Sequence, residues 1–222
     1  EFGCDENKLV RHPLGIDIKK FTLSNNKIIN KPDNKFKILT IARLVKEKGL
    51  EYAIEAIDKL RSKNHEIDIE YNIIGEGPLR ENLHQIINRR SLKKIVKMHG
   101  EQNQENVIDY LNRSHIFLLP SIAESFGLVL LEAQAAGLPV IATSVGGTYE
   151  AMIPTETGIL IPPKDPDAIA DELYALIQDP EKRIKMGFAG KKYVARHYDI
   201  ETLNDILVKI YQNVINSERN SD

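Results

Sequence analysis

Short apolar runs alternate with longer amphipathic segments over most of the chain. The runs are rich in branched side chains and end at glycine, proline or polar residues, a pattern typical of buried parallel strands. We predict strands at 37–42, 67–74, 95–100, 115–119, 140–143 and 158–161. Helices are predicted between them at 47–60, 79–87, 107–112 and 126–136, with a helical turn at 148–152. This alternation predicts an α/β fold, a Rossmann-like parallel sheet of about six strands with helices on both faces.

The two ends of the chain depart from this alternation. Residues 1–36 show no clear periodicity, and we predict an irregular segment there. The C-terminal part is predicted to be helical at 165–178, 182–198 and 200–215, with a break in the second helix at Gly187 or Gly190. Asp165 and Asp167 have the spacing of a metal-binding pair, but they precede a helix, so we expect N-capping there.

Composition narrows the class of protein. Of the 222 residues, 42% are hydrophobic and 28% are charged, which is ordinary for a globular protein. The net charge of −2 gives no general electrostatic case for nucleic acid. The single cysteine, Cys4, excludes an internal disulfide framework and fits a reducing compartment. No apolar run approaches the roughly 18 residues of a membrane span. We therefore expect a cytoplasmic protein.

The stretch from Leu119 to Gly147 contains the densest group of candidate site residues. Pro120 ends a buried strand, and the polar loop behind it lies where open α/β sheets bind ligands. The residues that follow open a helix, and their free N–H groups would suit an anion such as a diphosphate. These candidate binding residues are Ser125, Phe126, Gly127 and Leu128.

Two glutamates stand at this helix with seven residues between them: Glu124 just before it and Glu132 two turns inside it. If all the steps were helical, they would lie about 12 Å apart at about 1.5 Å per residue. That separation excludes a shared proton or a shared metal ion. Two interpretations remain: the glutamates bind two ends of an elongated ligand, or they are a helix-start charge and a solvated helix residue.

The loop after the first predicted strand carries a second candidate group. Arg43 and Lys48 stand at a strand end and a helix start, where the helix dipole favours negative charge. Such a conflict with local stability is expected at functional sites. The two cations could hold the phosphates of a nucleotide and stabilise charge on a leaving diphosphate. The alternative is a solvated basic loop, and we assign the neighbouring Lys46 to that class.

The 124–147 segment, ESFGLVLLEAQAAGLPVIATSVGG, closely resembles the signature of retaining glycosyltransferases of family four (glycosyl transferases group 1). Enzymes of that family have the GT-B fold. The resemblance implies that Glu124 lies near the donor sugar and that Glu132 binds the donor ribose. The 42–49 segment is similar to the family's diphosphate-binding loop, which implies that Arg43 and Lys48 are phosphate ligands. We take Arg43, Lys48 and Glu124 as the catalytic residues.

Three further segments are similar to parts of the family's cleft. Gly75 and Gly77 match a Gly-Asp/Glu-Gly-Pro turn that lines it, although alone they would indicate a turn before a helix. His99 ends a strand where the family's backbone meets the base, and contact of its side chain with nucleotide stays open. Gly146-Gly147 resembles a glycine pair that faces the cleft.

The resemblance also implies a division of the chain. Residues 1–36 would be the linker from a missing N-terminal domain, and 37–198 the nucleotide-sugar-binding Rossmann-like domain. Residues 199–222 would be a C-terminal crossing helix with a frayed tail. The linker carries Gly15-Ile16-Asp17 followed by Phe21, as in the family, but Leu14 stands where the family commonly has Asn.

We therefore predict the C-terminal, donor-binding half of a retaining, hexosyltransferase-type enzyme of polysaccharide or glycolipid biosynthesis. The donor substrate would be a nucleotide-diphosphate-sugar, with no cofactor and no metal. A sugar or lipid-linked acceptor would bind through the missing domain, so this fragment alone is expected not to transfer sugar. The alternatives are a stand-alone nucleotide-binding module and another GT-B enzyme such as a nucleotide-sugar epimerase, against which Arg43, Lys48 and the glutamate pair argue.

One basic run bears on cellular location. Arg89-Arg90 and the lysines up to Lys97 follow a predicted helix. A solvated helix end that matches the dipole explains them. The alternative is a membrane-surface patch, which would place the protein at the inner face of the membrane.

Overall fold

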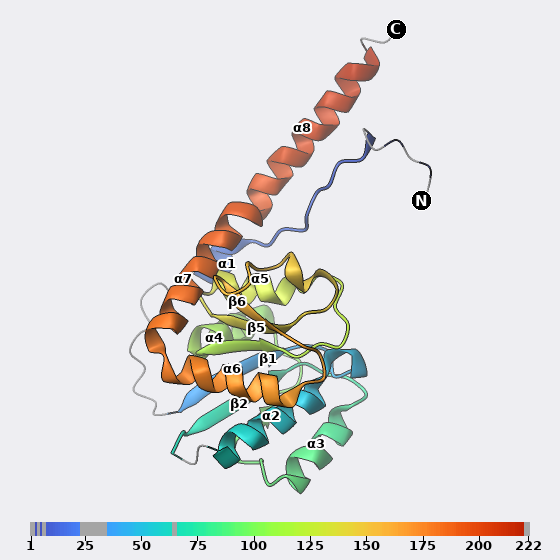
Figure 1. Ribbon diagram of the computed structural model, residues 1–222. Helices are drawn as coiled ribbons and strands as arrows, with labels where there is room; N and C mark the ends of the chain where they lie inside the picture. The colour runs from blue at the N-terminus through green and yellow to red at the C-terminus, as the bar shows by residue number, and fades with distance from the viewer. Residues whose placement is uncertain (1–2, 4, 6–7, 23–34, 64–65, 220–222) are drawn as a thin grey trace.

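The computed structural model describes residues 3, 5, 8–22, 35–63 and 66–219 (Figure 1). Much of the predicted linker, Cys4 and the extreme end of the predicted frayed tail lie outside the described residues.

A six-stranded parallel sheet forms the centre of the fold, in the order β3-β2-β1-β4-β5-β6. The strands are β1 (Phe36–Ile41), β2 (Ile69–Ile74), β3 (Val96–Met98), β4 (Ile116–Leu119), β5 (Val140–Thr143) and β6 (Gly158–Ile161). β1 pairs with β2 on one side and with β4 on the other. This is the doubly wound order, in which the chain reverses direction across the sheet between β1 and β4. The predicted fold class is confirmed.

Helices cover both faces of the sheet. They are α1 (Ile18–Thr22), α2 (Leu50–Lys63), α3 (Arg80–Arg89), α4 (Gln104–Arg113), α5 (Leu128–Ala135), α6 (Pro166–Gln178), α7 (Pro180–His197) and α8 (Ile200–Arg219). Two short 3₁₀ turns, η2 (Lys46–Lys48) and η3 (Gly146–Tyr149), stand at the ends of strands β1 and β5.

Adjacent strand residues point to opposite faces, so the sheet has two cores. Ile38 of β1 packs with residues of α2, α3 and α6. Its neighbour Leu39 packs with residues of α4 and α5 on the other face. α7 reaches both cores, through Met186 on one side and Val194 on the other. α6 and α7 therefore belong to the same packed unit as the sheet.

Three local predictions were wrong. The N-terminal segment contains the short helix α1, anchored by Phe21 in the core. α2 begins at Leu50 rather than at position 47, because Gly49 adopts a left-handed φ of 57° and ends η2 first. α7 is a single helix through Gly187 and Gly190.

The two glycines of α7 are packing positions rather than helix breaks. A Cβ on Gly187 would lie 2.1 Å from the carbonyl oxygen of Gly137, and one on Gly190 would lie 3.1 Å from Cγ of Gln134. The backbone of α7 therefore approaches α5 and the turn behind it more closely than any other residue type allows. This contact holds the C-terminal end of α5, the helix that carries Glu132.

α8 extends away from the sheet domain (Figure 1). Its first turn packs through the buried Leu203, whose carbonyl lies 2.9 Å from Nε2 of His12. Farther along, Ile206, Val208 and Tyr211 are exposed. No helix among the described residues is long and apolar enough to cross a membrane.

The α5–α7 contact gives a stability prediction. Gly187→Ala should lower the free energy of unfolding by about 1–3 kcal/mol, because the new methyl group overpacks the crossing. Ala195→Gly, on the exposed side of α7, is the matched control, expected to cost about 1 kcal/mol through helix propensity alone. Urea denaturation measures both. A stabilising Gly187→Ala would show that propensity outweighs the contact.

Candidate functional site

The loops after β1 and β4 meet at the carboxyl edge of the sheet. The backbone N–H groups of Ile122 and Ala123 donate to the carbonyl oxygen of Glu47, at 2.7 and 3.2 Å. A Cβ on Gly49 would lie 2.2 Å from the carbonyl oxygen of Pro120. β1 and β4 are neighbours at the point where strand order reverses, which is where doubly wound sheets bind ligands. The contacts therefore bring the two loops together at the expected ligand-binding position.

A cavity of about 390 Å³ lies between these two loops. Arg43 and Lys48 line it from the first loop, and Glu124 and Ser125 from the second. Arg43 is exposed, and no ion pair joins its guanidinium to another side chain in the described part of the chain. The structure thus brings together the three predicted catalytic residues.

Lys48 and Glu124 form an ion pair across the cavity. Nζ of Lys48 lies 2.6 Å from Oε2 of Glu124, and the two side chains are only 18% and 10% exposed. The hydroxyl of Ser121 donates to the same oxygen at 3.2 Å. Sequence reasoning assigned Lys48 and Glu124 to different parts of a ligand and missed both their direct contact and Ser121.

A buried chain of hydroxyl groups supports this pair from below. Ser121, Thr143 and Thr148 are fully buried. Thr143 donates its hydroxyl to the carbonyl of Ser121, and Thr148 donates to the carbonyl of Thr143 at 2.8 Å. The end of β5 and the turn η3 therefore fix the loop that carries Glu124.

Gly146 and Gly147 press against the same loop. A Cβ on Gly146 would lie 1.7 Å from the carbonyl oxygen of Glu124, and one on Gly147 would lie 2.2 Å from that of Ser125. The N–H of Gly147 donates to the Glu124 carbonyl at 3.2 Å. The glycine pair is a backbone support of the cavity wall.

The remaining candidates of the second loop occupy different environments. α5 starts at Leu128, two residues later than predicted, with Gly127 as its left-handed N-cap. Ser125 and Leu128 are exposed at this end of the helix. Phe126 is half-buried, and its ring centroid lies 5.8 Å from that of Tyr198. Phe126 thus packs against the core, and its predicted contact with ligand stays a prediction.

Gly75 and Gly77 support the first loop. A Cβ on Gly75 would lie 2.0 Å from the carbonyl oxygen of Ala42, and one on Gly77 would lie 2.6 Å from that of Leu44. Neither glycine lines the cavity that contains Lys48 and Glu124. The contacts explain why glycine is needed here, and a direct contact with ligand stays a prediction.

The His99 side chain is held by protein groups at both ring nitrogens. Nε2 lies 2.6 Å from Oδ1 of Asn72, and Nδ1 lies 2.9 Å from the hydroxyl of Tyr110. Burial lowers the pKa of His99, an effect that Lys97 adds to and Glu70 opposes. A neutral ring that donates from Nε2 and accepts at Nδ1 fits this network. These contacts fix the orientation of the His99 ring, and its predicted contact with nucleotide stays a prediction.

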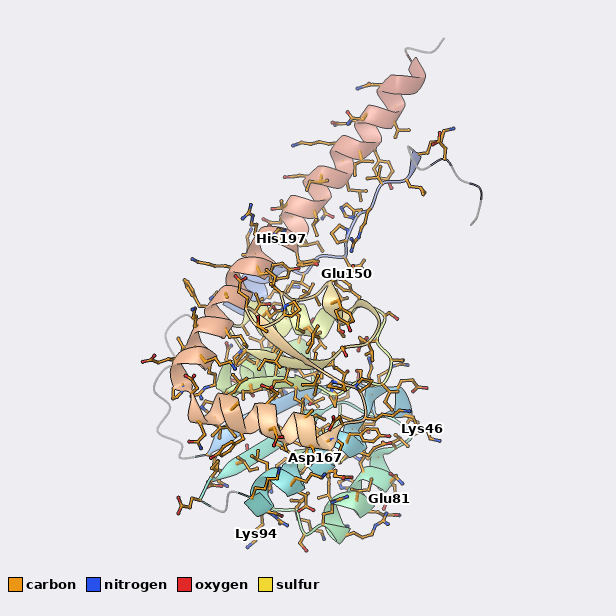
Figure 2. The ribbon with its side chains drawn as sticks, viewed as in Figure 1. Lys46, Glu81, Lys94, Glu150, Asp167 and His197 are labelled. Carbon is orange, nitrogen blue, oxygen red and sulfur yellow. The ribbon has the colours of Figure 1, made fainter. Side chains whose placement is uncertain are left out.

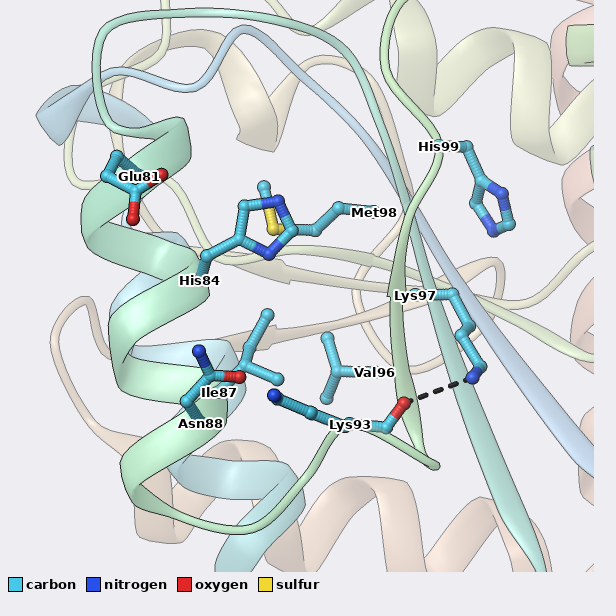
Figure 3. A pocket seen from close by; sticks show the side chains of 9 residues that line it. All are labelled: Glu81, His84, Ile87, Asn88, Lys93, Val96, Lys97, Met98 and His99. Carbon is cyan, nitrogen blue, oxygen red and sulfur yellow. Dashed lines mark hydrogen bonds between the residues drawn. The ribbon is translucent and has the colours of Figure 1, made fainter.

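A second cavity, of about 600 Å³, lies between α3 and the edge strand β3. Figure 3 shows His84 and Met98 on one side of β3 and His99 turned to the other. Glu81 and Lys93 lie farther along its rim. This mixed surface lacks the convergent charges found between the loops after β1 and β4.

Glu132 lies in α5, half-buried. Burial raises the pKa of its carboxyl group. No hydrogen bond or ion pair to this carboxylate comes from any residue that the structure describes. Glu132 does not line the cavity that contains Lys48 and Glu124. A half-buried carboxylate with a raised pKa is typical of a group that acts on a ligand, and its predicted contact with ribose stays a prediction.

The described residues contain no group of three or more His, Cys, Asp or Glu side chains that could hold a metal ion. Asp165 caps α6 by accepting from the N–H of Ala168 at 2.9 Å, as predicted. Asp167, at the start of α6 in Figure 2, pairs instead with Lys59 at 2.6 Å.

Two curated relatives show the range of the family. The chain is 34% identical over 195 residues to a D-inositol 3-phosphate glycosyltransferase of Arthrobacter sp. (strain FB24), covering 85% of this chain and 46% of that protein. It is 33% identical over 203 residues to an amylovoran biosynthesis glycosyltransferase of Erwinia amylovora, covering 89% and 49%. The chain thus spans about half the length of the curated relatives that it matches.

One solved structure matches the fold of this chain, and the match covers the whole of the solved chain. It is the C-terminal domain of a glycosyl transferase group 1 family protein from Francisella tularensis, with a TM-score of 0.74 and 30% identity, covering 84% of this chain and 100% of that one. The model of the family "Glycosyl transferases group 1" matches residues 22–193. The predicted resemblance is confirmed: the chain belongs to the glycosyl transferases group 1 family, and its sheet domain is the Rossmann-like half of a GT-B fold.

Proposed function

We propose that this chain binds the nucleotide-diphosphate-sugar donor of a retaining glycosyltransferase. The convergence of Arg43, Lys48 and Glu124 on one cavity carries the proposal. Two cations at the carboxyl edge match a diphosphate, and a carboxylate beside them matches the hydroxyl groups of the sugar attached to it.

The residues divide the work of sugar transfer. As the bond from the sugar to the diphosphate breaks, negative charge grows on the diphosphate oxygens. Arg43, Lys48 and the N–H groups at the start of α5 stabilise that charge. Glu124 accepts hydrogen bonds from the sugar hydroxyls, and Glu132 accepts them from the ribose. The donor is thereby held at both ends.

The names of the relatives support a role in glycoconjugate assembly. One relative is named for biosynthesis of amylovoran and another for transfer to D-inositol 3-phosphate. Their names point to different products, whereas both match this chain over most of its length. We therefore propose a hexosyltransferase of polysaccharide or glycolipid biosynthesis, with its acceptor held by the half of such enzymes that this chain does not span.

We place this activity in the cytoplasm, at the inner face of the membrane where the acceptor is lipid-linked. The predicted basic run gives this location limited support. Arg90 pairs with Glu55 at 3.2 Å and with Asp58 at 3.0 Å. Its charge is thus neutralised within the domain, and the contact with membrane would depend on the acceptor half.

The phosphate assignment gives a prediction. Arg43→Ala should weaken binding of a nucleoside diphosphate by about 1.5–3 kcal/mol, the range for a charge-assisted hydrogen bond. Lys48→Ala should weaken binding by an amount near the lower end of this range, because Lys48 must break its ion pair with Glu124 before it can bind the diphosphate. Binding of the bare nucleoside should barely change. Isothermal titration with UDP, GDP and ADP and their nucleosides measures both quantities.

Lys46→Ala is the matched control, because Lys46 lies on the same loop, outside the cavity and at the margin of the molecule (Figure 2). It removes an equal charge and should have little effect. Equal losses for diphosphate and nucleoside in the Arg43 variant would contradict the assignment.

Donor binding should not require a divalent metal. Cations and helix N–H groups already face the diphosphate, so EDTA should leave its dissociation constant unchanged. The measurement is titration of the diphosphate with and without EDTA, followed by added Mg²⁺. Binding lost in EDTA and restored by Mg²⁺ would overturn this expectation.

We expect Glu132 to lower the free energy of unfolding and to strengthen nucleotide binding. Its folded-state pKa is raised above the unfolded value, so the ionised form opposes folding above that value. Glu132→Gln should therefore raise the free energy of unfolding at pH 7.5 and weaken nucleotide binding. The gain should decline as the pH falls below the raised folded-state pKa and disappear below about pH 4.3, where the unfolded chain also binds the proton. Exposed Glu101→Gln is the control, and a Glu132 variant that is destabilised at pH 7.5 would contradict the prediction.

A further inference from the structure

The ion pair between Lys48 and Glu124 joins two residues that the proposed function assigns to different parts of the donor. Lys48 would bind the diphosphate and Glu124 the sugar, yet the two side chains neutralise each other at 2.6 Å. Both are largely shielded from water, so their contact is stronger than that of an exposed pair. Any ligand that recruits Lys48 must compete with Glu124.

A nucleoside diphosphate without sugar competes poorly. Its oxygens can accept from Lys48, but they then lie beside a carboxylate that has lost its cation. Two anionic groups at this distance repel each other, and a mostly buried carboxylate without a partner is costly. The bare diphosphate therefore binds against an opposing charge.

The intact donor resolves this conflict. Its sugar follows the second phosphate, and its hydroxyl groups are hydrogen-bond donors. They replace the ammonium group as partners of Glu124 and separate the carboxylate from the phosphates. Both residues then have a partner in the complex.

Glu124 stays in place during this exchange. Ser121 keeps donating to Oε2 at 3.2 Å, and the buried hydroxyl of Thr143 holds the Ser121 backbone. Among the described residues, no donor reaches Oε1 of Glu124. That oxygen is available to a sugar hydroxyl while Oε2 is anchored. Ser121 is thus a positioning residue for the carboxylate.

We propose that the Lys48–Glu124 ion pair makes the site discriminate between the sugar-bearing donor and the nucleoside diphosphate that transfer releases. The inference rests on the proposed function and extends it to product release. The diphosphate product meets an unpaired Glu124 as soon as the sugar leaves. Lys48 then returns to Glu124, and the product is expelled.

The test compares each diphosphate with its own nucleotide-sugar. We would titrate residues 1–222 with UDP and UDP-glucose, GDP and GDP-mannose, and ADP and ADP-glucose, and use the pair that binds tightest. Glu124→Gln keeps the shape of the side chain and removes its charge. It should tighten the diphosphate and weaken the nucleotide-sugar, shifting the ratio of their dissociation constants by about tenfold or more.

Glu47→Gln is the matched control. Glu47 also lines the cavity, but it is exposed and does not pair with Lys48. Its substitution should move both affinities in the same direction and leave their ratio unchanged. If Glu124→Gln also leaves the ratio unchanged while the wild type binds both ligands, this inference is overturned and the donor-binding proposal stands. If the wild type binds none of the ligands, both are overturned.

A double-mutant cycle gives an independent readout. In the wild type, Lys48→Gln removes a phosphate contact and also an ion pair that binding would have broken. In the Glu124→Gln background it removes only the phosphate contact. Lys48→Gln should therefore weaken diphosphate binding more in the Glu124→Gln background than in the wild type. An equal or smaller loss would overturn the exchange, and a variant with retained urea midpoint excludes misfolding as the cause.

Discussion

The backbone contact between the loops after β1 and β4 is the constraint on which the site depends. The carbonyl of Glu47 accepts two N–H groups of the second loop, and Gly49 lies directly against Pro120. Any side chain at Gly49 would push the loops apart. Without this contact the cations of one loop and the glutamate of the other would face separate volumes of solvent.

Sequence reasoning succeeded for features that do not depend on this contact between distant loops. Strand runs, helix starts and the carboxyl edge follow from local patterns, so the sheet and most helix bounds could be predicted from the residues. Arg43 and Lys48 were chosen because their positive charges stand at a strand end and a helix start, where the dipole favours negative charge. Glu124 was chosen for its position before the next helix and its spacing from Glu132. A family signature sharpened their roles, although it could not say which side chains touch.

The contacts within the site that the sequence did not predict depend on which strands are neighbours. Lys48 and Glu124 are 76 positions apart, and only the pairing of β1 with β4 brings them together. Ser121 carries no charge and belongs to no distinctive spacing, so nothing local indicates that it holds a carboxylate. The glycines of α7 were misread for the same reason, because a close approach of two helices leaves no trace in the periodicity of either.

The path of α7 has a consequence for how the domain comes apart. One end of this helix is built into the core on one face of the sheet and the other end into the core on the opposite face. If the core on either face loosens, α7 loses packing contacts, and α7 also packs against the core on the opposite face. Because α7 connects the two cores, we expect them to unfold as one cooperative unit. Local opening should be confined to loops that α7 does not contact. Lys48 and Glu124 stand on the loops at the carboxyl edge and belong to neither core, so these two side chains can exchange partners without disturbing the sheet beneath them.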